Sequence, residues 1–159
     1  MPDEAVTAAD LRAYELFTEQ SSEDLAGLVS AARRRILTDR QVLVVRGEAR
    51  AWVAWIVSGR IALSVDHEGR SVMLETLGPG DMLGWSMLRQ DPVALATARA
   101  VGPAEIIEVP AERLLDAATT GTPAARHLVR RLIGAAAADL EASRAQLLRL
   151  GREGIISAG

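Results

Sequence analysis

Residues 44–64, VVRGEARAWVAWIVSGRIALS, decide the expected fold. This stretch holds two short runs rich in apolar, β-branched and aromatic residues, and Gly59 separates them. In the second run Ile61, Leu63 and then Val65 occupy alternate positions. Because successive side chains of a strand point to opposite faces, this spacing predicts a strand with one buried face.

Runs of the same kind lie on both sides of this stretch. They are QVLVVRG at 41–47, RSVMLETLGPGD at 70–81, LATARAV at 95–101 and AEIIEVP at 104–110. The residues DHEG at 66–69 are typical of a hairpin turn. Several short strands at near-regular spacing, punctuated by glycines, predict an antiparallel sandwich or barrel.

Helical patterns flank the strands. An amphipathic pattern predicts a helix over residues 8–20, and a capping box formed by Ser21 and Asp24 predicts the start of a second helix. After Pro110 the pattern becomes helical again, and one long helix is expected over residues 122–150. Helices around a β-roll give an α+β fold that is mainly β.

The whole chain is expected to form a single domain, because its length is that of one ordinary folded unit. The arginine run Arg33, Arg34 and Arg35 is expected at the solvent-exposed end of the second helix, an interpretation favoured over a nucleic-acid-binding patch. The expected parts are N-terminal helices at 1–35, a β-roll at 36–109, C-terminal helices at 110–150 and a tail at 151–159.

Composition excludes several classes of function. The net charge of −3 offers no general positive field for nucleic acid, and the absence of cysteine excludes disulfides, thiolate metal sites and a cysteine nucleophile. The histidines, His67 in a turn and His127 on the last helix, are not placed to share a metal or to serve a serine nucleophile. We therefore expect neither catalysis nor a metal nor another cofactor.

The ends and the hydropathy pattern bear on location. The first ten residues, MPDEAVTAAD, lack the basic flank and apolar run of a signal peptide. No apolar run approaches the roughly 20 residues of a membrane span. We expect a cytoplasmic protein without membrane contact.

The long helix carries a stripe of apolar residues at alternating three- and four-residue steps. Such a stripe either pairs with a second copy of the helix or packs on the chain's own β-roll, and the length of the helix favours a homodimer. The residues of the stripe are Val129, Ile133, Ala136, Leu140 and Leu147.

The order of elements and their glycines resembles the cyclic nucleotide-binding domain of the catabolite activator and fumarate–nitrate regulator superfamily. Gly47, Glu48, Ile56 and Gly59 match that family's Gly-Glu and I-x-x-G pattern. The run LGPGDMLGWSML, residues 77–88, matches its Gly-Asp turn and the start of its phosphate-binding cassette. The resemblance implies a jelly-roll β-roll with the cassette at 80–96.

In that family a glutamate in the cassette accepts a hydrogen bond from the ribose and an arginine pairs with the cyclic phosphate. Here the corresponding positions hold Trp85 and Ala94, so both charged groups are missing. Arg89 is a possible anion partner, and Arg99 is the other nearby cation. The ligand-contacting residues that the resemblance implies are Leu83, Gly84, Trp85, Ser86, Met87, Ala94, Leu95 and Ala96.

Three functions stay open at this point. The first is a non-catalytic sensor or regulatory module with weak or altered nucleotide binding, acting through an unknown effector protein. The second is a ligand-free dimeric assembly module in which Trp85 fills the pocket, and the third is a sensor for another molecule that stacks on Trp85. The regulators of this family bind DNA through a helix-turn-helix module that is not recognised here, so we expect no direct DNA binding.

Overall fold

Two four-stranded antiparallel sheets form the body of the molecule in a computed structural model, which describes residues 5–157 and side chains as far as Arg152. One sheet has the strand order β1-β8-β3-β6 and the other β2-β7-β4-β5. This arrangement confirms the α+β jelly-roll prediction. The strands are β1 (Arg33–Leu37), β2 (Val42–Val44), β3 (Trp52–Ser58), β4 (Ile61–His67), β5 (Arg70–Leu77), β6 (Met82–Leu83), β7 (Thr97–Ala100) and β8 (Ala104–Pro110).

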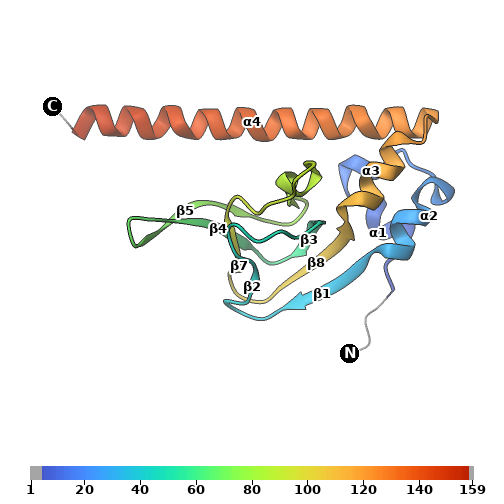
Figure 1. Ribbon diagram of the computed structural model, residues 1–159, viewed down its shortest axis with the longest axis horizontal. Coiled ribbons are helices and arrows are strands. Elements are labelled where there is room, and N and C mark those ends of the chain that lie inside the picture. The colour runs from blue at the N-terminus through green and yellow to red at the C-terminus, as the bar shows by residue number, and fades with distance from the viewer. Residues whose placement is uncertain (1–4, 158–159) are drawn as a thin grey trace.

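Helices pack at one end of the β-roll and along one side of it (Figure 1). The capping box at Ser21 is confirmed, since the amide of Asp24 donates to Ser21 Oγ at 3.1 Å and the Ser21 amide donates to Asp24 Oδ2 at 3.0 Å. The helices are α1 (Ala8–Arg12), η1 (Glu15–Phe17), α2 (Ser22–Ala31), η2 (Trp85–Leu88), α3 (Ala111–Thr119) and α4 (Pro123–Ser157).

The single helix expected over residues 8–20 is wrong. It is divided into α1 and the 3₁₀ turn η1, because Tyr14 between them has extended backbone angles, φ −96° and ψ 135°. The break turns Phe17 fully into the core, where its ring meets that of Trp55 at a centroid distance of 5.0 Å. The N-terminal segment is thereby packed onto strand β3.

The arginine run is also placed differently from the expectation. It begins strand β1 instead of ending a helix, and β1 pairs with β8 over five residues. The guanidinium of Arg34 forms ion pairs with Glu105 on β8 and with Asp10, the latter at 3.0 Å, and Arg35 pairs with Glu108 at 3.0 Å. Carboxylates from distant parts of the chain thus stabilise arginines in a strand.

The long helix α4 lies across the β-roll and extends above the β4–β5 hairpin (Figure 1). At its start Arg131 pairs with Glu15 at 2.8 Å and with Glu19 at 3.2 Å. Farther along, Gln146 Nε2 donates a hydrogen bond to the Leu74 carbonyl at 2.7 Å. The helix continues to Ser157, past the expected boundary at residue 150, and the tail residues 158–159 lie outside the described part of the chain.

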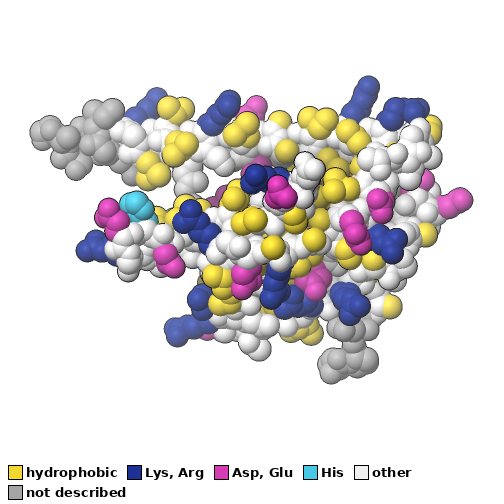
Figure 2. All heavy atoms as spheres, viewed as in Figure 1, with side chains coloured by type: hydrophobic (Ala, Val, Ile, Leu, Met, Phe, Trp, Pro, Cys, Tyr) yellow, Lys and Arg dark blue, Asp and Glu magenta, His cyan; other side chains and the backbone are white. Residues whose placement is uncertain are grey.

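The expected dimer stripe lies mostly on the open surface of α4. Ile133, Leu140 and Leu147 are 64%, 51% and 68% exposed, Ala136 is exposed and Val129 is half-buried. The hydrophobic side chains along α4 can be followed in Figure 2. No helix within residues 5–157 is long and apolar enough to cross a membrane.

Candidate functional site

A tight turn before β6 places the start of the cassette. The Asp81 carboxylate accepts a hydrogen bond from the Gly78 amide at 2.8 Å, which closes the turn. On its other side the turn is joined to β3, because the Gly80 amide donates to the Ile56 carbonyl at 2.9 Å and the Ile56 amide donates to the Asp81 carbonyl at 3.1 Å. The Gly-Asp pair therefore fixes the direction of the chain into the cassette.

Gly84 allows the next segment to lie directly against β3. Its φ is 103°, in the left-handed region, and a Cβ built on it would lie 2.9 Å from the Trp52 carbonyl oxygen. Any other residue would be both strained and in collision with backbone there. The 3₁₀ turn η2 follows immediately and carries Trp85 and Ser86 at its start, with Met87 buried behind them.

The second half of the cassette is fastened to the loop after β2. The Ala94 amide donates to the Glu48 carbonyl at 3.0 Å, and the Gly47 amide donates to the Ala94 carbonyl at 2.8 Å. Ala94 is buried, whereas Leu95 is 60% exposed. The Gly-Glu pair of the loop therefore holds the position where the resemblance expects an arginine.

The two halves of the cassette line an open cavity of about 150 Å³. All eight residues expected to contact a ligand line this cavity, so the structure brings them together around one space. The expected anion partner Arg89 is exposed and does not line this cavity. Arg99 is also exposed, and its guanidinium donates to the Arg40 carbonyl at 3.1 Å, away from the cassette.

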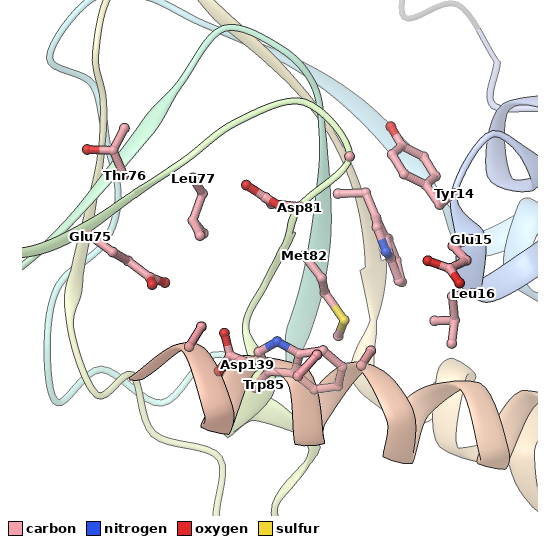
Figure 3. Close-up of a pocket in the computed structure, with 15 residues that line it drawn as sticks. Tyr14, Glu15, Leu16, Glu75, Thr76, Leu77, Asp81, Met82, Trp85 and Asp139 are labelled. Carbon is pink, nitrogen blue, oxygen red and sulfur yellow. The ribbon is translucent and has the colours of Figure 1, made fainter. Parts of the chain in front are cut away.

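A second cavity, of about 450 Å³, lies between the β-roll and α4 (Figure 3). Trp85 and Met82 line both cavities, so the two spaces adjoin at the indole. Tyr14 and Trp55 also line the larger one, and Tyr14 lies on the far side of this cavity from Glu75 (Figure 3). Trp85 is half-buried, and its side chain lies between the two spaces.

Acidic side chains surround these cavities. Glu15, Glu75, Asp81 and Asp139 line the larger one, and Glu75 and Asp139 also line the smaller. No arginine or histidine is among the described residues that line either space, and the chain has no lysine. Burial raises the pKa of Glu75, and the negative charges of Asp139 and Asp81 raise it further. The site is therefore electronegative.

Sequence reasoning missed the contribution of α4 to this site. Ala135, Ala138 and Ala142 from α4 let the helix approach the roll, and Asp139 projects beside Trp85 (Figure 3). The i, i+3, i+4, i+7 spacing of these four residues was a usable signal, since it puts them on one helical face. The sequence did not indicate that this face of α4, and not another, turns toward the β-roll.

The two histidines lie outside these cavities. His67 is exposed on the β4–β5 hairpin. His127 lies near the start of α4, and its Nε2 is 2.9 Å from a carboxylate oxygen of Glu19. Within the described residues, no three side chains of the types that ligate metals are grouped so that they could hold a metal ion.

Comparison with known proteins places this geometry in a family. The family model for the cyclic nucleotide-binding domain matches residues 34–120, which is more than half of the chain. No curated protein matches the chain at a significant level.

Solved structures share the fold at low sequence identity. The Thermus thermophilus catabolite activator protein is 23% identical with a TM-score of 0.69, and the match covers 86% of this chain and 62% of that one. A cyclic nucleotide-binding domain from Methylobacillus flagellatus is 18% identical with a TM-score of 0.72, covering 87% and 79%. The regulatory domain of Toxoplasma gondii PKA, crystallised with cAMP, is 21% identical with a TM-score of 0.61, covering 69% and 42%.

These likenesses show the fold, and the chain spans less than two thirds of the length of the Thermus and Toxoplasma chains. The family-model match runs from the second residue of β1 through β8 and includes the Gly-Asp turn and the cassette described above. The chain therefore belongs to the cyclic nucleotide-binding domain family.

Proposed function

We propose that this protein is a non-catalytic regulatory module of the cyclic nucleotide-binding type whose cassette has weak or altered affinity for cyclic nucleotides and whose output passes through a partner protein. One observation carries the proposal: Glu75 and Asp139 line the cassette cavity, and no arginine or histidine is among the described residues that line it. A cyclic phosphate carries a negative charge and needs a positive partner or several amide donors.

The charge balance of the site works against an anion. An anion entering the cassette would lie in a cavity shared with two carboxylates, and like charges at short range disfavour each other. Trp85 replaces a hydrogen-bond acceptor with an indole, which can only donate. The backbone amides around Gly84 and Ser86 are the remaining candidates for an anion site, because Arg89 does not line the cavity and the Arg99 guanidinium is bound to the Arg40 carbonyl.

Isothermal titration calorimetry with cyclic AMP and cyclic GMP tests this proposal. We expect the wild type to bind with a Kd weaker than about 1 mM. A matched variant, Trp85→Glu with Ala94→Arg, restores the two missing side chains. The carboxylates of Glu75 and Asp139 would compete with the nucleotide phosphate for the new arginine. The double variant is therefore also combined with Glu75→Gln and Asp139→Asn. Micromolar binding by the wild type contradicts the proposal.

The alternative is a ligand-free assembly module, and one observation favours it. Without the adjoining larger cavity, the cassette cavity measures about 150 Å³, whereas small-molecule sites usually enclose about 300 Å³ or more. If the pocket no longer binds any nucleotide, none of the restored variants shows a heat of binding in calorimetry, although all remain folded. Binding by the restored variants alone supports an altered cassette on a sound scaffold.

The proposed oligomer is a homodimer formed through α4. Ile133, Leu140 and Leu147 recur every seven residues and are all more than half exposed. A seven-residue repeat is the spacing with which two helices pack along a common seam. A second copy that covers this seam would bury the largest apolar side chains on the outer face of α4, and sedimentation velocity would report the dimer.

A further inference from the structure

The helix α4 is firmly attached only at its beginning. Leu128 is buried, and Arg131 is paired with Glu15 and Glu19. Beyond Arg131 the helix is exposed at almost every position and passes over the larger cavity. Among the described side chains of this part, Gln146 forms the hydrogen bond to the roll, at the Leu74 carbonyl. Figure 2 shows a cleft between this part of α4 and the hairpin.

Like charges face one another across this weak contact. Glu75 comes from β5, Asp81 from the turn before β6, and Asp139 from α4, and all three line the larger cavity (Figure 3). Within the described residues, the side chains of Glu75 and Asp139 form no hydrogen bond or ion pair, whereas the Asp81 carboxylate accepts a hydrogen bond from the Gly78 amide. The carboxylate on the helix therefore meets two carboxylates of the roll without a compensating cation.

We propose that charge on Glu75, Asp81 and Asp139 controls how α4 is seated on the β-roll, so that the distal part of the helix is loosened when these groups are ionised and seated when one of them is neutralised. The proposal concerns the helix itself and does not depend on whether the cassette binds a nucleotide. It makes the module a charge-sensitive lever whose fixed end is the start of α4.

The other groups around Glu75 do not reverse this effect. Glu15 and Tyr14 line the same cavity from the N-terminal segment, and the charge of Glu15 is paired with Arg131. The strand neighbour of Glu75 on β4 is Leu63, and β6 contributes Met82 to the cavity, so neither adds a charge. The surroundings are therefore negative or neutral at every described wall.

The sign of the pH dependence follows from the direction of the Glu75 shift. Its pKa is raised above the ordinary value of 4.5 by burial and by the two neighbouring carboxylates. A carboxyl group with a raised pKa favours the seated state when it is protonated. The seating is therefore present at low pH and is lost as the pH rises through the raised pKa.

Distance measurement between two spin labels tests the proposal. Because the chain has no cysteine, Ser71→Cys on β5 and Ser143→Cys on α4 give one defined label pair, and both serines are exposed. Labelled protein is diluted into excess unlabelled protein so that distances within one chain dominate. We expect the short, seated distance to gain population by about two- to fivefold as the pH is lowered from about 7.5 to about 4, below the ordinary glutamate pKa of 4.5.

A matched pair of variants distinguishes an effect of the cavity carboxylates from a general effect of removing negative charge from α4. Asp139→Asn removes the charge on α4 that faces the roll, and Glu141→Gln removes one nearby that lines neither cavity. We expect Asp139→Asn to give mostly the seated distance at both pH values and Glu141→Gln to behave as the wild type.

Should Asp139→Asn unfold the protein, Glu75→Gln supplies the same test from β5. A distance distribution of the wild type that does not change with pH overturns the proposal. Equal effects of Asp139→Asn and Glu141→Gln overturn it as well. Calorimetry with cyclic nucleotides affects neither result, so a failure here is distinct from a failure of the proposed function.

Discussion

Replacing Gly84 by alanine should destabilise the protein more than replacing Gly80, although both glycines flank the same short strand. Both have a positive φ, 103° and 92°, and each alanine would carry a backbone strain of about 1–2 kcal/mol. At Gly80 the new Cβ meets nothing within 4 Å. At Gly84 it lies 2.9 Å from the Trp52 carbonyl oxygen and 3.3 Å from Val53 Cα, both rigid backbone atoms of β3.

The collision at Gly84 adds to the strain. Forcing an extra carbon into a filled space costs about 1–3 kcal/mol in addition. We therefore expect a loss of about 2–5 kcal/mol in the free energy of unfolding for Gly84→Ala, against about 1–2 kcal/mol for Gly80→Ala. The excess measures how tightly the cassette is packed on β3.

Urea denaturation followed by far-ultraviolet circular dichroism measures both losses. The midpoints should fall in the order wild type, Gly80→Ala, Gly84→Ala, with unchanged m values, since the surface exposed on unfolding stays the same. Equal losses for the two variants would refute the reasoning, because the contact of Gly84 with β3 would then carry no cost. A loss below about 1 kcal/mol for Gly84→Ala would do so too.

Three further predictions follow from other parts of the molecule. Replacing Arg34 by methionine leaves the half-buried carboxylates of Asp10 and Glu105 without their cation. We expect urea denaturation to show a loss of about 1–3 kcal/mol in the free energy of unfolding, and a loss below about 0.5 kcal/mol would contradict the stabilising role of these ion pairs. The pKa of Asp10 is lowered from its ordinary 3.8, chiefly by its hydrogen bond with Thr7, so the stability that its carboxylate contributes is present above pH 3.8 and is lost as the pH falls through the lowered pKa. In thermal melts across this range, the melting temperature of Asp10→Asn should fall less steeply with decreasing pH than that of the wild type. Parallel curves for the two proteins would contradict this. Leu140→Glu places a charge in the middle of the exposed α4 stripe, and sedimentation velocity should show at least a tenfold weaker dimer, whereas an unchanged dimer would move the seam elsewhere.

Much of the fold could be predicted from the sequence because its signals are local. The capping box at Ser21, the hairpin at residues 66–69 and the long helix after residue 122 each depend on neighbouring residues, and the structure confirms them. Strand β1 could not be recognised in this way. Its arginines are held by Glu105 and Glu108, which lie more than 70 positions away in the chain.

The site was predictable only in part for the same reason. The cassette residues are close in sequence, and the structure places them around one cavity. The acidic character of that cavity comes from Glu75 and Asp139, which belong to a strand and a helix far apart in the sequence. Their meeting depends on the rotation of α4 about its axis, and the alanines on several faces of that helix left the rotation undetermined.

The most direct test of the central claim is a titration of isotopically labelled protein with cyclic AMP, followed through the backbone amide signals of Gly84, Trp85 and Ser86 in heteronuclear NMR spectra. The account predicts that these signals do not shift in a saturable way up to about 1 mM nucleotide, because the described residues that line the cavity beside them include two carboxylates and no cation. Saturable shifts of these amides at micromolar nucleotide would contradict it and would show that the backbone of the cassette suffices to bind the cyclic phosphate.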